Sequence, residues 1–261
     1  MIAFSSVSPT DLRCAIDRLK GNNIGHRPLT NYFFQPVDKA TNLRMLESER
    51  TLCFSHDEWD FTRVYIVTFD VENLGELLQA VSWPPLVVTD WVCQAAPDIE
   101  ICLMNLGFHL HATYDRIVCT NIRSDQPNTY IDFASPRDRE HIHALLFRAF
   151  DKYADHIMLI EELDELITER LVILNRDPRG TIDGLVVFPL KGQSCHFNFL
   201  YNRGGSVGLS RLLGNFYGVL TERGVKAGFG WVRRTRPLVL RLHESFGWKK
   251  DGLVDRIYLR S

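Results

Sequence analysis

The segment covering residues 195–223 limits the possible folds more than any other part of this 261-residue chain. Residues 195–201 alternate in the manner of a strand, and a glycine-rich turn follows at residues 203–208. A helix is then predicted from about Leu209, on an apolar stripe formed by Leu209, Leu212, Leu213, Phe216, Tyr217 and Leu220. This order directs several backbone N–H groups and the positive end of a helix dipole at one point. The segment therefore predicts either an anion-binding loop, suited to phosphate, or a tight turn.

The elements after this helix follow in regular order. Gly224 ends the helix, and residues 225–232 have the pattern of a strand. Pro237 begins a second helix that runs to about Phe246 and stops at Gly247-Trp248. A last strand is predicted at residues 253–259. The end of the chain is thus predicted to run strand, loop, helix, strand, helix, strand.

Both the order of elements and the loop resemble those of the GCN5-related N-acetyltransferases (GNATs). The family's loop signature, (Q/R)-x-x-G-x-(G/A), is filled by Arg203, Ser206 and Gly208, with Ser206 in place of the usual glycine. The resemblance covers residues 131–261. It implies the α/β (α+β) acyl-CoA N-acyltransferase fold, in which helices flank a mixed, mostly antiparallel sheet.

A later family signature, Leu-Tyr-x-x-x-Gly-Phe, is matched by Leu242, His243, Gly247 and Trp248. His243 stands where the family usually places a tyrosine that acts as the general acid. An imidazole titrates near neutral pH, so His243 is predicted to protonate the departing thiolate. The alternative is a histidine that packs from a helix face against the neighbouring strand.

The acceptor amine must also lose a proton, and the strand at residues 195–201 carries no glutamate. His196 and Asn198 share one face of that strand, because strand side chains repeat every two residues. His196 is predicted to act as the base, directly or through water, or else to be a core histidine. Asp183 on the preceding strand is a further candidate.

The resemblance implies acetyl-CoA, or another acyl-CoA, as co-substrate and a primary amine of a small molecule, such as an amino sugar or amino acid, as acceptor. The donor's pantetheine arm would lie in a gap between the strands at 195–201 and 225–232. The predicted donor-binding residues are Leu200, Tyr201, Arg203, Gly204, Gly205, Ser206, Val207, Gly208 and Leu209.

The same order of elements recurs earlier in the chain, at residues 61–118, and Gly107-Phe108 parallels Gly247-Trp248. This predicts two copies of one fold, a domain at 1–120 and a domain at 130–261, joined by a polar linker at 120–129. The first copy is predicted to be non-catalytic. Asp70 and Glu72 stand where a pyrophosphate would lie, and Leu103 stands at the position that matches His243.

Composition excludes several classes of function. The net charge of −2 gives no electrostatic basis for binding nucleic acid or an anionic membrane, and no apolar run approaches the ~20 residues of a membrane span. The start of the chain lacks a signal-peptide pattern, and the six cysteines lack CxxC spacing. A cytoplasmic monomer or homodimer with free thiols is expected. His109 and His111 share a strand face without a third ligand, so no metal site is predicted.

Arg233-Arg234-Thr235-Arg236 forms a basic run before the second helix. It could bind an anionic acceptor or the 3′-phosphate of the donor, or be a solvated loop. The alternative function from another class is a non-catalytic CoA-binding module that serves as a sensor or scaffold. The departures from the family at Ser206, Arg236 and His243 support that alternative.

Overall fold

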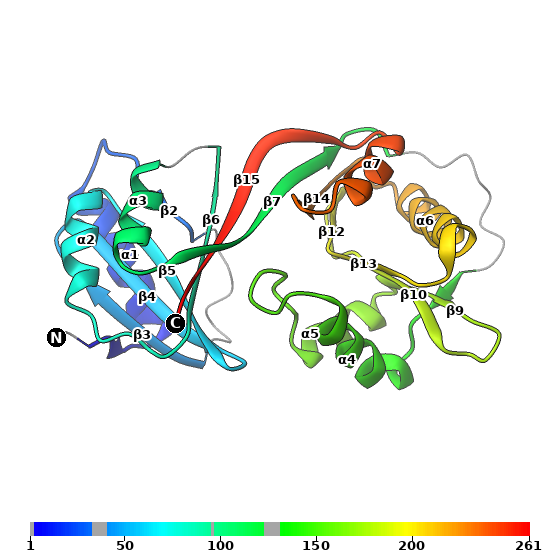
Figure 1. The fold of residues 1–261 in the computed structure, drawn as a ribbon, viewed down its shortest axis with the longest axis horizontal. Coiled ribbons are helices and arrows are strands. Elements are labelled where there is room, and N and C mark those ends of the chain that lie inside the picture. Colours follow the sequence, from blue (N-terminus) through cyan, green and yellow to red (C-terminus); the bar gives the residue numbers. More distant parts are fainter. Residues whose placement is uncertain (1–2, 33–40, 95–96, 123–130) are drawn as a thin grey trace. The chain divides into compact units, whose positions relative to one another are not determined.

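The computed structural model describes residues 3–32, 41–94, 97–122 and 131–261 (Figure 1). These residues divide into two compact units, Met1–Thr113 with Leu253–Ser261, and Tyr114–Gly252. The predicted linker at 120–129 lies outside the described residues from position 123 onward.

In the first unit, helices cover both faces of one sheet. The strands, in spatial order, are β1 (Ser5–Ser6), β3 (Thr41–Glu47), β4 (Thr51–Glu58), β5 (Phe61–Thr68), β6 (Val87–Cys93) and the end of β15 (Lys249–Arg260). The pairings are antiparallel except β5 with β6, which is parallel. A short strand, β2 (Leu29–Thr30), also pairs with β5.

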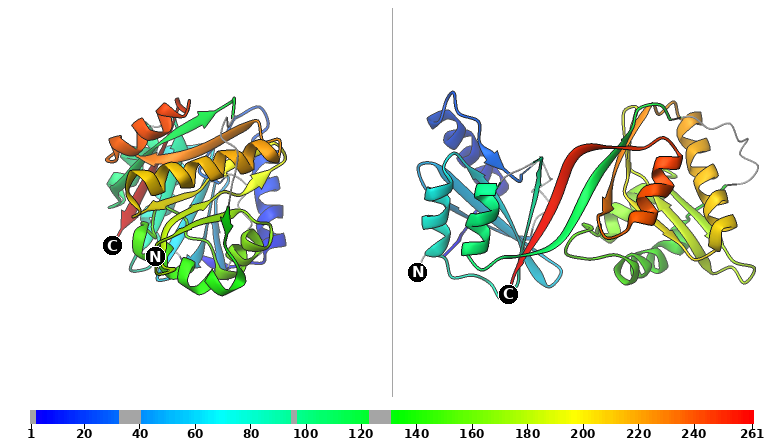
Figure 2. Two further views of the ribbon diagram at one scale, coloured as in Figure 1. Left: turned by 90° about the vertical axis from the view of Figure 1, so that its right-hand side faces the viewer. Right: turned by 45° about the horizontal axis from the view of Figure 1, so that its top comes forward.

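Three helices complete the first unit: α1 (Pro9–Asn22), α2 (Val71–Gln79) and α3 (Pro97–Asn105). A capping box starts α1, because the Ser8 hydroxyl accepts from the Asp11 amide and the Asp11 carboxylate accepts from the Ser8 amide. The apolar stripe of α1 packs on one face of the sheet, while α2 and α3 lie side by side on the other (Figure 2).

The second unit contains two groups of strands. One is an antiparallel sheet in the order β13 (Phe199–Asn202), β10 (Ile182–Val187), β9 (Val172–Arg176) and β8 (Asp132–Phe133). The other runs β11 (Leu190–Lys191), β12 (Ser194–Phe197), β14 (Ala227–Arg233) and the end of β7 (His109–Cys119). The strand predicted at 195–201 is therefore two strands, because the chain leaves one ladder and enters the other at Asn198.

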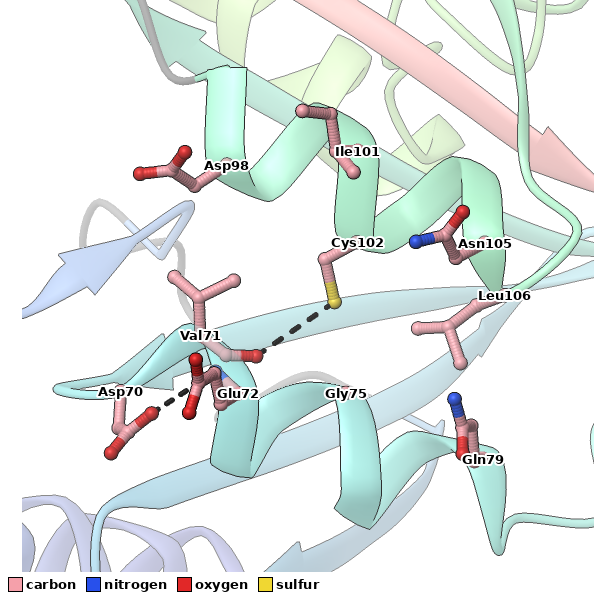
Figure 3. A pocket seen from close by; sticks show the side chains of 10 residues that line it. All are labelled: Asp70, Val71, Glu72, Gly75, Gln79, Asp98, Ile101, Cys102, Asn105 and Leu106. Atoms are coloured by element: carbon pink, nitrogen blue, oxygen red, sulfur yellow. Dashed lines mark hydrogen bonds between the residues drawn. The ribbon is translucent and has the colours of Figure 1, made fainter.

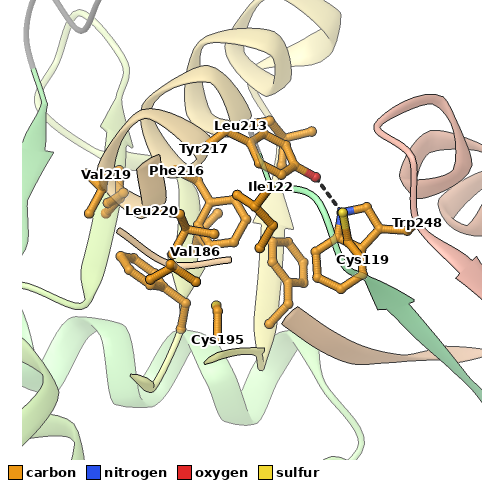
Figure 4. Close-up of a cluster of buried hydrophobic side chains, with 14 of the residues drawn as sticks. Cys119, Ile122, Val186, Cys195, Leu213, Phe216, Tyr217, Val219, Leu220 and Trp248 are labelled. Atoms are coloured by element: carbon orange, nitrogen blue, oxygen red, sulfur yellow. Dashed lines mark hydrogen bonds between the residues drawn. The ribbon is translucent and has the colours of Figure 1, made fainter. Parts of the chain in front are cut away.

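Helices α4 (Arg139–Ala149) and α5 (Ile160–Thr168) cover one side of these strands, and α6 (Gly205–Glu222) and α7 (Pro237–Ser245) cover the other (Figure 1). The predicted stripe of α6 is confirmed as part of the core, with Leu209 at its edge. Figure 4 shows this core, in which the Trp248 indole N–H donates to the Tyr217 hydroxyl at 2.7 Å. The Gly-aromatic pair thus anchors the end of α7 against α6.

Two strands pass from one unit into the other, which differs from the predicted domains at 1–120 and 130–261. Residues 114–119 of β7 pair with β14 in the second unit. Residues 254–260 of β15 pair with β6 in the first unit. Sequence order assigns each strand to the copy that it follows, but hydrogen bonding places each with the other copy.

Candidate functional site

The candidate site of the second unit is a gap between strands that diverge. β12 and β14 pair in parallel only as far as Phe197 and Gly230. Beyond that point β13 pairs with β10 alone and is an edge strand within the described part of the chain. Edge strands leave one row of N–H and C=O groups without strand partners. Leu200 and Tyr201, the predicted arm-binding residues, lie on this edge strand and are half-buried.

The loop at the end of β13 leads directly into α6, which begins at Gly205 rather than near Leu209. The prediction was late by one turn because Gly205 and Gly208 read as turn residues, although Gly208 is buried within the helix. Gly205 has φ of +67°, a conformation that favours glycine. Among the described residues, no side chain caps this helix. Its first N–H groups and its dipole therefore remain available to an anion.

The amide side chains of Asn175 and Asn202 hold the first turn of α6 in place. Asn175 on β9 is 3% exposed, and its Nδ2 donates to the Gly208 carbonyl at 2.6 Å. Arg211 Nε donates to the Asn175 Oδ1 at 3.2 Å, and Asn202 Nδ2 donates to the Gly205 carbonyl at 3.0 Å. Sequence reasoning missed Asn175, although an asparagine after the apolar run at 171–174 was a visible signal. These contacts fix the direction of the first turn.

Asp183 lies at the foot of the loop. The Arg203 amide donates to its carbonyl at 2.6 Å, and a Cβ at Gly204 would come within 3.0 Å of its Oδ2. A side chain at position 204 would therefore crowd the Asp183 carboxylate. A carboxylate here opposes anion binding, whereas the exposed Arg203 and the helix dipole favour it.

His243 lies near the end of α7 and is 3% exposed. Its ring packs edge-on against Phe197 and Trp248, with ring centroids 4.9 Å and 5.7 Å away. Its Nδ1 has no hydrogen-bond partner among the residues that the structure describes. Burial lowers the pKa of His243 to about 4. The imidazole is therefore neutral at neutral pH, so it can donate a hydrogen bond from one N–H but does not carry the extra proton of an imidazolium acid.

His196 stacks on Phe229, with ring centroids 4.4 Å apart. Burial, and secondarily the neighbouring His156, lower the pKa of His196 to about 4, which makes it a weak base. His196 and Phe197 are successive residues of one strand, so they point to opposite faces. His243 packs on the Phe197 side. The structure therefore does not bring the two predicted catalytic histidines to one face of β12.

The basic run is partly engaged in ion pairs. Arg233 pairs with Asp151 at 3.2 Å, and Arg234 pairs with Asp115. Arg236 is the N-cap residue of α7 and is exposed, and no ion pair involves it among the described residues. Of the three arginines, Arg236 is thus the one available to an anionic ligand.

Other features bear on cofactors and location. In the described ranges, no group of three or more His, Cys, Asp or Glu side chains could hold a metal ion, His109 and His111 included. All six cysteines are free thiols. No helix in the described part of the chain is long and apolar enough to cross a membrane.

Comparisons with known proteins identify the fold. No protein-family model matches the sequence, and no curated protein matches it. Among solved structures, a GCN5-related N-acetyltransferase from Sphaerobacter thermophilus is similar at 16% identity, with a TM-score of 0.57 over 81% of this chain and 76% of that chain. An acetyltransferase of the GNAT family from Colwellia psychrerythraea is similar at 8% identity, with a TM-score of 0.58 over 98% of each chain. The chain therefore has the GNAT fold.

A further solved structure is similar over both units of the chain. A tandem GNAT protein from the clavulanic acid biosynthesis pathway, solved without acetyl-CoA, is similar at 11% identity. The match has a TM-score of 0.56 and covers 98% of this chain and 97% of that chain. Because the likeness extends over nearly all of both chains, it confirms the prediction of two copies of the fold.

Proposed function

We propose that this protein is an acyl-CoA-dependent N-acyltransferase that uses acetyl-CoA and acts at the second unit on the primary amine of a small molecule. One observation supports this most directly: the uncapped N-terminus of α6 lies at the end of an edge strand beside a gap between diverging strands. The helix end suits the donor's pyrophosphate, and the strand edge suits the amides of its arm.

Each part of the donor would contact a different set of residues. Gly204, Gly205 and the first turn of α6, through Ser206, Val207, Gly208 and Leu209, would bind the pyrophosphate, with Arg203 and Arg236 adding positive charge. The backbone of Leu200 and Tyr201 would hold the arm and polarise the thioester carbonyl. The amine nitrogen then forms a bond to the carbonyl carbon, the C–S bond breaks, and the sulfur leaves as a thiolate that takes up a proton.

The low pKa values of His243 and His196 limit how each histidine could assist a proton transfer. His243 would assist the thiolate as a neutral hydrogen-bond donor, because burial keeps its pKa at about 4. His196, which lies on the opposite face of β12, would accept the amine's proton only through water and as a weak base. These two low pKa values favour the second candidate function, a CoA-binding module without transferase activity. Release of free thiol from acetyl-CoA in the presence of a panel of amines separates the two functions.

Donor binding is tested by thermal unfolding. A ligand that binds only the folded state stabilises it by mass action. At a donor concentration 100-fold above Kd, Tm should rise by about 5–10 °C. Gly205→Glu should abolish this rise, since it places a carboxylate at the helix N-terminus.

Gly192→Glu is the matched control. Gly192 also has a positive φ, of 59°, and open space around it, but it lies in the turn before β12. This variant should keep the full rise in Tm. A full rise in a folded Gly205→Glu variant would show that the donor binds elsewhere.

A further inference from the structure

In the first unit, the gap between β5 and β6 is filled by the chain itself. The two strands pair in parallel only at Thr62 and Arg63. Beyond Arg63, the edge of β5 that faces the gap is taken by β2, with Leu29 opposite Thr68 and Thr30 opposite Val67. The first unit therefore has no open edge where the second unit has β13.

Asn31 follows β2 and joins the two strands. Its side chain, in a residue that is 1% exposed, accepts from the Ile66 amide at 2.6 Å. Its Nδ2 donates to the Val64 carbonyl on β5 at 3.2 Å and to the Thr89 hydroxyl on β6 at 3.0 Å. The Asn31 amide also donates to the Ile66 carbonyl at 3.3 Å. Amide groups of the chain thus satisfy both backbone groups of Ile66.

The anion position of the first unit is filled as well. Asp70 caps α2, and its Oδ1 accepts from the amides of Glu72 at 3.0 Å and Asn73 at 3.1 Å. Arg50 lies 3.5 Å from the same carboxylate. The cavity of about 570 Å³ between α2 and α3 is lined by three carboxylates, those of Asp70, Glu72 and Asp98 (Figure 3). Such a lining repels a phosphate-bearing ligand.

The two units have the same spacing between strand and helix in this region. Arg63 is the last β5 residue paired with β6, and α2 begins eight residues later at Val71. Phe197 is the last β12 residue paired with β14, and α6 likewise begins eight residues later at Gly205. In this register Ile66 corresponds to Leu200, and Asp70 corresponds to Gly204. The strand edge and the helix N-terminus that are occupied in the first unit therefore correspond to those that the proposed function assigns to the donor in the second unit.

We propose that residues 29–31 and Asp70 form a built-in pseudo-ligand that closes the first unit to the acyl donor. Amide groups of Asn31 stand where the second unit would receive amides of the donor's arm, and the Asp70 carboxylate stands where it would receive pyrophosphate. The inference rests on the proposed function for the identity of the donor. Its consequence is one donor site per chain, in the second unit.

Calorimetric titration of the full chain with acetyl-CoA, without an amine, measures the number of sites. One site per chain is expected, and none in Gly205→Glu. Two sites in the wild type, or one that persists in Gly205→Glu, would overturn the pseudo-ligand. Absence of any binding would instead reject the proposed function, and the experiment below would then decide the pseudo-ligand alone.

Hydrogen exchange tests the contact itself, independently of any donor. Asn31→Ala removes the acceptor of the Ile66 N–H, so exchange at that amide should quicken at least ~10-fold, while amides of the β3–β4 ladder keep their rates. If this variant does not fold, Asn31→Ser, which is too short to join both strands, replaces it. Unchanged protection of Ile66 in either folded variant would show that Asn31 does not close the gap.

Discussion

A single buried residue, His243, shows how environment limits chemistry. An exposed imidazole has a pKa near ~6.5 and changes charge around neutral pH. Between Phe197 and Trp248 the charged form loses its hydration, and the pKa falls to about 4. The sequence alone predicts that His243→Tyr would flatten the fall in rate from about pH 7 to 9. Because the imidazole is neutral throughout that range, the expected difference in pH dependence between the wild type and His243→Tyr should vanish.

We expect His243→Ala to lower kcat by about 10²-fold or less, because the lost hydrogen bond assists a thiolate that already leaves readily. The donor Kd should change by no more than about twofold. The ratio of wild-type to variant kcat should stay constant between pH 6 and 8, since the pKa of about 4 lies below this range. Steady-state rates across that range, with chemistry rate-limiting, provide the measurement.

Wild-type turnover in His243→Ala would make His243 a packing residue. A ratio that changes around pH 6.5 would instead show that the imidazolium form takes part. His196→Ala, which changes the opposite face of β12, is measured in the same way for comparison.

Strand β15 carries a buried carboxyl group into the first unit. Asp255 is 8% exposed, and its Oδ1 has no hydrogen-bond partner among the described residues. Burial raises its pKa well above the usual value, and repulsion from Asp90 adds to this, while Arg63 and Arg256 act in the opposite direction. Asp90 itself pairs with Arg63 at 3.2 Å. The folded state therefore favours the protonated form of Asp255.

The sign of the pH dependence follows from this shift. Between the unfolded pKa of about 3.9 and the raised folded value, the folded state binds more protons than the unfolded state. Stability should therefore fall as pH rises above about 4. Asp255→Asn carries no charge at any pH, so it should be more stable than the wild type at pH 7.5 by at least about 1 kcal/mol, and similar to it near pH 4.

Urea unfolding at both pH values measures this difference. Asp17→Asn, on the exposed side of α1, is the control and should shift stability little at either pH. Equal stability of Asp255→Asn and wild type at pH 7.5 would contradict the raised pKa.

Strands β7 and β15 make each predicted half of the chain depend on residues from the other half. A fragment of residues 1–120 lacks the β15 residues that pair with β6. A fragment of residues 130–261 lacks the β7 residues that pair with β14. Ile117 and Ile257 are fully buried in these segments, so each fragment also loses core packing.

We therefore expect neither fragment to fold cooperatively when expressed alone. The intact chain should show protease resistance that both fragments lack. Circular dichroism melting and limited proteolysis measure these properties. A 130–261 fragment with a sharp melting transition and acetyl-CoA binding would show that the second unit does not need β7.

Local features of this protein could be predicted from its amino-acid sequence. The cap at Ser8, the glycine after α6 and the stripe from Leu209 to Leu220 depend on neighbours within a few residues, so their patterns could be read directly. The two degenerate motifs in order were enough for the fold, because each encodes a local geometry: an uncapped helix start after Arg203 and a helix end at Gly247.

The pairing of segments that are distant in the sequence could not be predicted and is seen in the folded structure alone. Pairing of β15 with β6, entry of Asn31 between β5 and β6, and support of Gly208 by Asn175 all join residues more than 25 positions apart. No local pattern marks such partners, because many alternating segments present equivalent backbone groups. The pKa of His243 was equally hidden, since it depends on desolvation by Phe197 and Trp248 after the core has formed.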